Sequence, residues 1–494
     1  MGIILLIDPG PKGQKNLHIP LALLHVAKPL EDNGFEVEIL DTRVRDYRDI
    51  DLDKVLCAGI TTMTSPVQIS LGLEVAQYIK EKRRDLPIIW GGTHPSILPD
   101  ETVENPYVDI VVRGEGEDTL LELVRKIDAS QSWKSVEGIT YKRDGQVVST
   151  PDRGLLDLNR AGNLPYHLIR KEDYPTARYA FDYLSSKGCP HRCAFCCDIN
   201  NRRRMWRAKR AEVVVNEIEY IVDEFDPERI VFVDANFFVS KKRVEAICRL
   251  IKERSLNLKF QVSCRFDYFA EFEPSFVRLL KESGFDELVM GAESGSDRML
   301  DFIKKDINKD EIIASVKTCE EHGIKPVISF VTGFPTENEN DLEETLNLYD
   351  KIMNVGPSTE INGFFIFMPY PGCTLSDFIK KEYDYVPADS LDGWAYVKWW
   401  EETGFPWMTT KKSSKLQTIH LMVRYFFVQK LMRKWSFEHR KARVGNSTLL
   451  AFAMILLINM LSFPAKLRWR HRVFHFPIEW KIWKLVLKHF VGWV

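Results

Sequence analysis

The chain has 494 residues, enough for two or three domains, and its hydrophobic content of 45% can fill large cores. The formal net charge of −2 excludes the overall basic character with which many proteins attract nucleic acid. Nine cysteines are too few for a disulfide scaffold and favour a reducing cytoplasm. The apolar segment Met1–Asp8 has no basic stretch before it and no cleavage site, so it predicts a first strand rather than a signal peptide.

Residues 1–128 alternate short apolar runs with helical patterns. The expected strands cover residues 3–7, 36–40, 55–60, 87–90 and 109–112, and the expected helices cover 20–33, 66–83 and 117–127. This alternation predicts the α/β class with a doubly wound, Rossmann-like parallel sheet. Ligands of such sheets bind at the carboxyl ends of the strands. The loops at those ends are rich in glycine and hydroxyl groups; they cover residues 8–13, 59–65, 91–95 and 113–117.

Residues 129–180 are predicted to form a linker that contains a hairpin with an Asp144-Gly145 turn. Strand–helix alternation resumes over 181–378, with strands expected at residues 183–186, 229–233, 258–263, 287–290, 327–331 and 361–367. Six such units fit a partial (β/α)6 barrel. Catalytic groups in α/β barrels lie at the carboxyl ends of the strands.

Three cysteines, Cys189, Cys193 and Cys196, stand on one short stretch with the spacing Cys-x3-Cys-x2-Cys. Thiolates on such a loop can converge on an iron–sulfur cluster, and three of them leave one iron of a four-iron cubane open for chemistry. The basic residues nearby would lower the thiol pKa values; they are Lys187, Arg192 and Arg202, Arg203 and Arg204. A zinc site with His191 as fourth ligand is the alternative. Cys197 is one thiol too many for the motif and is interpreted as a packing residue, with a ligand role as the alternative.

The octad Cys189–Cys196 resembles the signature of the radical S-adenosylmethionine (SAM) enzymes, including the aromatic Phe195. The resemblance implies a [4Fe-4S] cluster whose open iron binds SAM and splits it into methionine and a 5′-deoxyadenosyl radical. The three cysteines are then both metal ligands and catalytic residues. The resemblance also implies SAM contacts at the strand ends of the barrel, from Asp234, Asn236, Arg265, Glu293, Ser294 and Gly333.

The strand-end loops of residues 1–128, followed by the octad, resemble the cobalamin-dependent radical SAM methyltransferases and the anaerobic magnesium-protoporphyrin ester oxidative cyclase family. This resemblance implies that cobalamin is the third cofactor. Its expected contacts are Gly59, Thr61, Ser65, Gly91, Gly92 and His94. The chain has no Asp-x-His-x-x-Gly motif, so no histidine ligand to cobalt is expected from this domain. A degenerate domain without cobalamin is the alternative, and His94 fits a loop-structuring role better than a ligand role.

Residues 379–494 are expected to form a helical, aromatic-rich C-terminal region. Leu449–Ala465 is apolar but short of the roughly 20 residues that span a bilayer. Ile478–Val494 has the pattern of a basic amphipathic helix with tryptophans, which suits a membrane interface. The sequence therefore predicts peripheral attachment of residues 420–494 to the anionic cytoplasmic membrane face. The alternative is that these apolar stretches cap the barrel of a soluble protein.

The reaction that these resemblances favour is C-methylation. The apolar, aromatic-rich C-terminal part favours a hydrophobic small molecule as the substrate, such as a polyprenoid, a hopanoid-like lipid or a tetrapyrrole. Radical oxidation or ring closure without methyl transfer is the first alternative, and a non-enzymatic cobalamin or redox sensor is the second. A flavodoxin- or ferredoxin-type protein is the expected electron donor. Methylthiotransferases carry further cysteines in the N-terminal domain, where this chain has only Cys57. Nucleic acid is not an expected partner, because the C-terminal basic residues alternate with apolar stretches.

Overall fold

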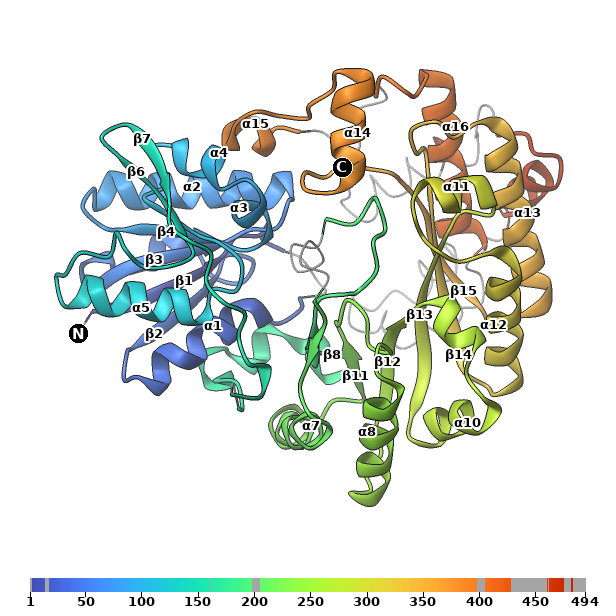
Figure 1. The fold of residues 1–494 in the computed structure, drawn as a ribbon, viewed down its shortest axis with the longest axis horizontal. Helices are drawn as coiled ribbons and strands as arrows, with labels where there is room; N and C mark the ends of the chain where they lie inside the picture. The colour runs from blue at the N-terminus through green and yellow to red at the C-terminus, as the bar shows by residue number, and fades with distance from the viewer. Residues whose placement is uncertain are drawn as a thin grey trace. The chain divides into compact units, whose positions relative to one another are not determined.

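The computed structural model describes residues 2–13, 17–160, 162–197, 205–397, 405–427, 460, 462–474 and 481–482. They belong to two compact units, whose helices and strands are labelled in Figure 1. Unit 1 comprises Met1–Ser263, Glu273–Asp286 and Pro369–Trp399, and unit 2 comprises Cys264–Phe272, Glu287–Met368 and Trp400–Val494.

Unit 1 contains a seven-stranded sheet in the order β2-β1-β3-β4-β5-β6-β7. The first five strands in the chain are parallel, and β6 and β7 are antiparallel to their neighbours. Their bounds are β1 Ile3–Asp8, β2 Val37–Asp41, β3 Val55–Thr61, β4 Ile88–Gly91, β5 Ile110–Val112, β6 Ile139–Arg143 and β7 Gln146–Ser149. The chain runs from β1 to β2 on one side and to β3 on the other, so the sheet has its topological switch point beside β1.

Helices cover both faces of this sheet (Figure 1). On one face lie α1 (Leu21–Asp32) and α5 (Glu117–Asp128), which pack against each other. Leu120, Leu123 and Val124 of α5 follow helical spacing and enter the same core as the apolar residues of β1. On the other face lies α2, packed against α15. The bounds of α2 to α4 and α15 are Pro66–Lys82, Thr93–Ile97, Pro99–Glu104 and Leu391–Ala395.

The predicted hairpin is present, and its turn has left-handed backbone at both central residues, Asp144 (φ 52°) and Gly145 (φ 79°). Two successive positive φ values are the signature of a type I′ turn. The hairpin pairs with β5 and thereby extends the sheet, although the sequence places it in the linker. The predicted domain bounds, 1–128, 129–180, 181–378 and 379–494, stay a prediction.

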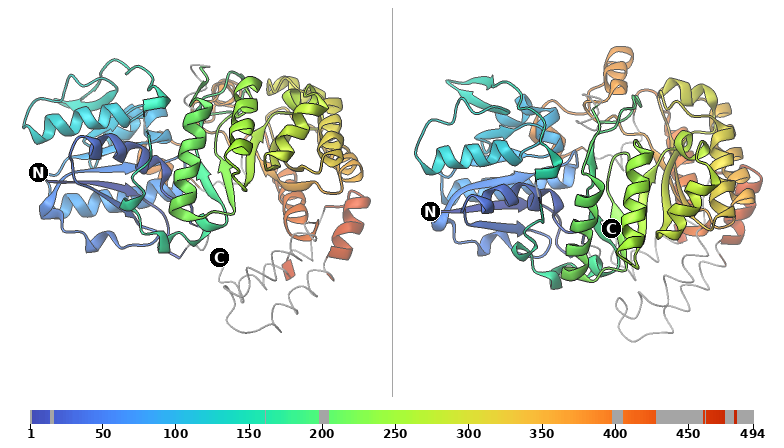
Figure 2. Two further views of the ribbon diagram at one scale, coloured as in Figure 1. Left: turned by 90° about the horizontal axis from the view of Figure 1, so that it is seen from below. Right: turned by 60° about the horizontal axis from the view of Figure 1, so that its bottom comes forward.

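The second part of unit 1 has three parallel strands, β8 (Phe181–Tyr183), β11 (Arg229–Phe232) and β12 (Lys259–Cys264), of which the last ends one residue beyond the unit. The helices α7 and α8 lie side by side, as both views of Figure 2 show. A short antiparallel ribbon, β9 (Ser186–Lys187) with β10 (Arg207–Ala208), precedes and follows the cysteine segment. The remaining helices of unit 1 are α7 Ala211–Phe225, α8 Lys241–Glu253, α10 Pro274–Glu282 and α14 Thr374–Tyr383, with single turns at Tyr47–Asp49, Leu52–Lys54, Leu158–Arg160, Tyr166–Leu168, Lys171–Asp173 and Pro175–Arg178.

Unit 2 has three further parallel strands, β13 (Phe285–Glu293), β14 (Lys325–Thr332) and β15 (Glu360–Ile366), of which the first begins two residues before the unit does. Five α-helices with described bounds belong to this unit. Their bounds are α9 Phe266–Ala270, α11 Asp297–Phe302, α12 Lys309–Glu321, α13 Glu339–Val355 and α16 Thr410–Leu421, and α16 continues into a π-helical turn at Met422–Phe427. Near the C-terminus, Trp469 donates a hydrogen bond to Asp350 of α13 (2.8 Å).

The α/β fold class is confirmed, with every expected strand of the first sheet present to within two residues. One expected strand, residues 183–186, is broken into β8 and β9, because the side chain of Asp234 binds the backbone and hydroxyl of Ser185. No helix in the described part of the chain is long and apolar enough to cross a membrane. The predictions for Arg202, Arg203 and Arg204, for most of Leu449–Ala465 and for most of Ile478–Val494 fall outside the described residues.

Candidate active site

The cysteine segment follows β9 as an irregular loop. Cys189 is buried, whereas Cys193 and Cys196 are half-buried. The Cys196 N–H donates to the Cys193 carbonyl (3.2 Å), which makes a tight turn between the second and third thiols. The start of α14 holds this turn, since the Leu375 N–H and the Thr374 hydroxyl both donate to the Ala194 carbonyl (3.0 and 3.1 Å). Among the described side chains, no three cysteine, histidine or acidic groups converge closely enough to hold a metal ion. The donor set itself, three thiols on one loop, is the one an iron–sulfur cluster takes.

Asp234, which follows β11, is a buried carboxylate that holds the base of the cysteine loop. It accepts hydrogen bonds from the Ser185 N–H (2.7 Å), the Ser185 hydroxyl (2.6 Å) and the Ser186 hydroxyl (2.5 Å). Burial raises the pKa of Asp234, and the hydrogen bonds from the two serines lower it. Both carboxylate oxygens are therefore engaged with the protein. The predicted contact of Asp234 with SAM stays a prediction, and the geometry adds a role in positioning the loop.

Asn236 lies next to the first cysteine of the loop. Its Nδ2 is 3.7 Å from the Cys189 Sγ, and its backbone carbonyl accepts from the Trp206 indole (3.0 Å). The Oδ1 atom is buried and has no hydrogen-bond partner within the described chain. A buried acceptor without a donor is costly. An acceptor beside a predicted cluster ligand fits a ligand amino group, such as that of SAM.

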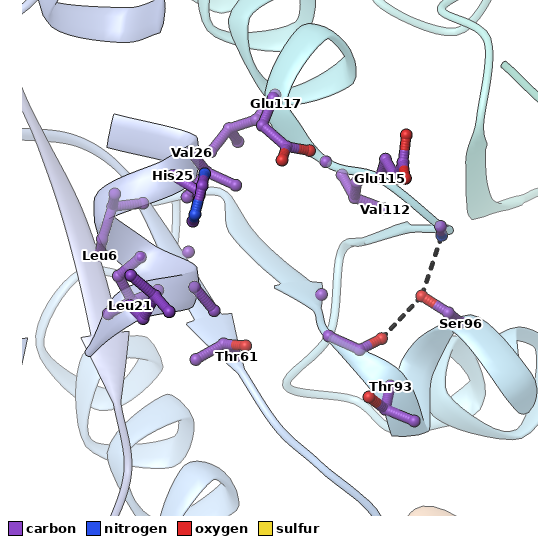
Figure 3. A pocket seen from close by; sticks show the side chains of 18 of the residues that line it. Leu6, Leu21, His25, Val26, Thr61, Thr93, Ser96, Val112, Glu115 and Glu117 are labelled. Atoms are coloured by element: carbon purple, nitrogen blue, oxygen red, sulfur yellow. Dashed lines mark hydrogen bonds between the residues drawn. The ribbon is translucent and has the colours of Figure 1, made fainter. Parts of the chain in front are cut away.

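A pocket of about 430 Å³ opens at the carboxyl ends of β3, β4 and β5, next to the switch point (Figure 3). Four of the six predicted cobalamin contacts line it: Gly59, Thr61, Gly91 and Gly92. Leu184, Lys187 and Val233 line it too; they stand between β8 and β9, on β9 and directly after β11. The rest of the lining is Leu6, Leu21, Ala22, Leu23, His25, Val26, Ile60, Ile89, Thr93, Ser96, Val112, Gly114, Glu115, Gly116, Glu117 and Leu120.

Gly92 shapes the rim of this pocket. Its φ is +95°, and a Cβ added there would lie 2.6 Å from the Thr62 carbonyl oxygen and 2.8 Å from the Thr61 hydroxyl. Only glycine fits this backbone. The Ser96 hydroxyl donates to the Gly92 carbonyl (2.6 Å) and accepts from the Gly114 N–H (3.0 Å), which links the loops after β4 and β5 (Figure 3). The cradle of backbone and small side chains fits the close approach of a large cofactor.

The other two predicted cobalamin contacts do not line the pocket. Ser65 precedes α2. His94 is fully buried and packs edge-on against Trp394 of α15, with ring centroids 5.5 Å apart. Neither ring nitrogen of His94 has a hydrogen-bond partner among the residues described. Burial lowers the pKa of His94 to about 4, so the ring is neutral near pH 7.

Several lining residues were not predicted from the sequence. His25 of α1 points into the pocket, and burial together with the nearby Lys187 and Lys209 keeps its pKa well below the ordinary value. Glu115 lies in the loop after β5 and Glu117 is the first residue of α5; both belong to the strand-end segment 113–117 that the sequence indicates, although neither was named as a contact. No pattern in the sequence singles out His25, because only the packing of α1 on the sheet turns this position toward the pocket.

In unit 2, Arg265 and Glu293 are both engaged with protein groups. The Arg265 guanidinium pairs with Asp267 (2.9 Å) and donates to the Lys305 carbonyl (2.6 Å). The Glu293 carboxylate pairs with the buried Lys305 ammonium (2.8 Å). Glu293 also has left-handed backbone, φ 61°, at the end of β13. Such conformations cluster at functional sites, because they persist only where the surroundings enforce them.

Ser294 and Gly333 lie at the ends of β13 and β14 in unit 2. The Ser294 hydroxyl is 3.2 Å from the Thr345 hydroxyl and accepts from the Ser296 N–H (3.1 Å). Gly333 has φ +77°, and its N–H donates to the Glu337 carboxylate (2.8 Å). The other residues predicted to hold the cluster or SAM belong to unit 1; they are Cys189, Cys193, Cys196, Asp234 and Asn236.

Two family models match the chain. Residues 14–124 match the B12 binding domain, and residues 183–349 match the radical SAM superfamily. The chain is a radical SAM enzyme with a B12-binding domain. Its cofactors are a [4Fe-4S] cluster, SAM and cobalamin, so the zinc site and the domain without cobalamin are set aside.

Curated relatives agree with this assignment, and a solved structure shares the fold. An uncharacterised methyltransferase of Pyrococcus horikoshii is 29% identical over 89% of this chain and 95% of its own. The anaerobic magnesium-protoporphyrin IX monomethyl ester cyclase of Synechocystis is 25% identical over 71% of this chain and 74% of its own. The cobalamin-dependent SAM radical enzyme OxsB, solved with aqua-cobalamin and SAM, is 16% identical and shares the fold with a TM-score of 0.72 over 93% of this chain and 72% of OxsB.

Proposed function

We propose that this radical SAM enzyme methylates an unactivated carbon of a hydrophobic small molecule. The observation that carries the proposal is the shared pocket of unit 1. Glycine-rich loops of the B12-binding sheet form one part of its wall, and Leu184 and Lys187 form another; Lys187 is on β9, the strand leading into the cysteine loop. A cofactor held there would lie near the predicted cluster ligands. The relationship to a methyltransferase over 89% of the chain supports the same reaction.

In this proposal Cys189, Cys193 and Cys196 hold the cluster, and Asn236 accepts a hydrogen bond from the amino group of SAM. The strand-end residues of unit 2, Arg265, Glu293, Ser294 and Gly333, are the further proposed SAM contacts. When bound, these cofactors supply the electron that splits SAM into methionine and a 5′-deoxyadenosyl radical, and the methyl group that the substrate receives. The protein orients the thiols through Asp234 and keeps the cobalamin rim open through Gly92.

The substrate class rests on the aromatic-rich C-terminal part and on one relative. The magnesium-protoporphyrin ester cyclase acts, by its name, on a tetrapyrrole, which is a largely apolar molecule. We therefore expect a polyprenoid, a hopanoid-like lipid or a tetrapyrrole. The electron donor is proposed to be a flavodoxin- or ferredoxin-type protein.

The test is an anaerobic incubation of cluster- and cobalamin-loaded enzyme with trideuteriomethyl-SAM, a membrane-lipid and tetrapyrrole extract, and either reduced flavodoxin or titanium(III) citrate. We expect 5′-deoxyadenosine and S-adenosylhomocysteine in equal amounts, and an extract component heavier by one trideuteriomethyl group in place of hydrogen. Loaded enzyme that forms no labelled product from the extract contradicts the methylation proposal. Turnover with titanium(III) citrate but none with reduced flavodoxin contradicts the proposed donor.

Cys196→Ala and Cys197→Ala are a matched pair of variants for this assay, because the two thiols are adjacent and only the first belongs to the motif. We expect C196A to lose most cluster iron and all 5′-deoxyadenosine, whereas C197A keeps both. Equal losses in the two variants would contradict the assignment of Cys196 as a ligand.

A second reaction, radical oxidation or ring closure, is favoured by the relationship to the cyclase. In the same assay it would yield 5′-deoxyadenosine without S-adenosylhomocysteine, and a product lighter by hydrogen atoms. The sensor hypothesis is set aside, since the chain is an enzyme.

Peripheral attachment of residues 420–494 to an anionic membrane, on the cytoplasmic side, is a further part of the proposal. The full chain should float with vesicles of phosphatidylglycerol and stay behind with vesicles of phosphatidylcholine. Raising the salt concentration should weaken the association, because it screens the attraction between lysine or arginine and anionic lipid. Absence of the protein from the anionic vesicles at low salt would rule the attachment out.

A further inference from the structure

A partly buried cluster of two acids and two bases joins the cobalamin pocket to the strand that leads into the cysteine loop. The Lys187 ammonium lies 2.8 Å from the Glu117 carboxylate and 3.9 Å from that of Glu115. The Arg207 guanidinium pairs with the same Glu115. Exposure of the four side chains is low, at 14%, 8%, 7% and 19% for Lys187, Glu117, Glu115 and Arg207.

The two bases face each other across the β9–β10 ribbon, in which Lys187 and Arg207 are direct partners. Like charges directly opposite on an antiparallel pair repel each other. Glu115, on the loop after β5, and Glu117, the first residue of α5, offset that repulsion. The Leu156 N–H donates to the Glu115 carboxylate (2.8 Å), and the Leu156 carbonyl accepts from the Arg207 guanidinium. Glu115 and Arg207 are therefore also linked through the backbone of Leu156. The ribbon therefore depends on this loop of the B12-binding sheet for its position.

The same residues line the pocket. Lys187, Glu115 and Glu117 all belong to its wall, and Lys187 precedes Cys189 by two positions. The four charges cancel, so the cluster offers no net attraction for the phosphate of a nucleotide. Breaking one pair would leave a buried charge without its partner, which costs more than the pair contributes. These properties indicate that the cluster holds the β9–β10 ribbon against the B12-binding sheet, rather than binding a charged group of a ligand.

We propose that Lys187 is a positioning residue that couples the occupancy of the cobalamin pocket to the geometry of the cysteine loop. A molecule that fills the pocket touches Glu117 and Lys187. Only Gly188 separates Lys187 from Cys189, the first predicted cluster ligand. Coupling of this kind is reciprocal, so the state of the cluster loop also changes the affinity for cobalamin. The coupling does not depend on which reaction the enzyme performs.

The test uses full-length enzyme reconstituted anaerobically with its cluster. The electron paramagnetic resonance spectrum of the reduced cluster is recorded with and without hydroxocobalamin, and the Kd of hydroxocobalamin is measured by absorbance. We expect cobalamin to shift the cluster signal of the unmodified enzyme. Lys187→Met should abolish the shift and weaken cobalamin binding about tenfold, and Lys187→Arg should restore much of both, because it keeps the charge.

Lys171→Met is the matched control, since Lys171 forms an ion pair with Glu224 in the same unit, away from the pocket lining. It should behave as the unmodified enzyme does. If K187M fails to take up iron, Glu117→Gln replaces it in the test, because this variant removes the same ion pair by changing the partner in the B12-binding sheet. The inference is overturned if the unmodified enzyme shows no cobalamin-dependent shift, or if the variant that retains the cluster keeps both the shift and the affinity. Neither the spectrum nor the Kd depends on methyl transfer, so a failure of the coupling can be distinguished from a failure of the proposed methylation.

Discussion

At the residue scale, His94 of α3 is a buried ionisable side chain, so it makes the stability of the fold depend on pH. The ring is fully buried against Trp394, and burial lowers its pKa to about 4 from the ordinary 6.5. The unfolded chain therefore binds more protons than the folded chain between these two values. Stability is then fully present above pH 6.5 and is lost as the pH falls toward 4. A shift of this size corresponds to roughly 3 kcal/mol.

The change that tests this is His94→Phe, which keeps an aromatic ring against Trp394 but cannot be protonated. We expect the melting temperature of the unmodified protein to fall more steeply between pH 6.5 and pH 4.5 than that of H94F, as measured by anaerobic circular dichroism. His167→Phe is the control, because His167 is an exposed ring paired with Glu31. Parallel decreases in the unmodified protein and H94F would show that His94 does not carry the effect.

At the scale of elements, the loop between β4 and α3 is built around a backbone that only glycine adopts. Gly92 combines a φ of +95° with a Cβ position 2.6 Å from the Thr62 carbonyl oxygen. Gly34 has a similar φ, +80°, but nothing lies within 4 Å of its Cβ position. The two glycines separate the effect of backbone strain from the effect of a collision.

Gly34→Ala should cost about 1 kcal/mol, the penalty of a left-handed alanine, and leave cobalamin binding unchanged. Gly92→Ala adds the collision with Thr62, so it should lower stability further and weaken cobalamin binding by tenfold or more. Denaturation by urea and absorbance titration with hydroxocobalamin measure the two effects. Equal affinity in both variants would mean that the Gly92 rim does not contact the cofactor.

At the scale of the whole molecule, the radical SAM match ends at residue 349, yet unit 2 uses chain beyond it to hold a predicted SAM-binding turn. Trp407 donates to the Gly333 carbonyl (3.0 Å), and Lys412 of α16 donates to the Glu337 carbonyl (2.5 Å) and pairs with its carboxylate (3.4 Å). Burial raises the pKa of Glu337, and Lys412 opposes that rise. Residues of the C-terminal part therefore hold the turn that contains Gly333, whose contact with SAM stays a prediction.

Lys412→Met should remove the counter-charge of a buried carboxylate and lower stability by roughly 3 kcal/mol. Because Glu337 also binds the Gly333 N–H, we expect the Kd of SAM to rise as well, as measured by equilibrium dialysis with the reconstituted enzyme. Lys411→Met is the matched control, since the adjacent Lys411 is exposed. An unchanged Kd in a destabilised K412M would limit the role of α16 to stability.

Much of the fold follows from local pattern. Apolar runs bounded by glycine and polar residues identify the strands, and the period of the apolar positions identifies α1, α2 and α5, because burial of one face requires that period. The residues that join β8 to β9 were harder to predict. Asp234, nearly fifty positions away, takes Ser185 out of the strand pattern, and no local pattern records such a contact.

The sequence by itself determined the chemistry of this protein: three thiols at a fixed spacing on one loop, and glycine-rich strand ends in the order of a B12-binding sheet. Both are local properties, set by covalent spacing and backbone freedom. Only the tertiary structure decided which strand-end residues line the pocket, since that depends on how α1, α5 and the β9–β10 ribbon pack around it. His94 was thereby moved into the core, and His25, Glu117 and Lys187 were brought to the pocket wall.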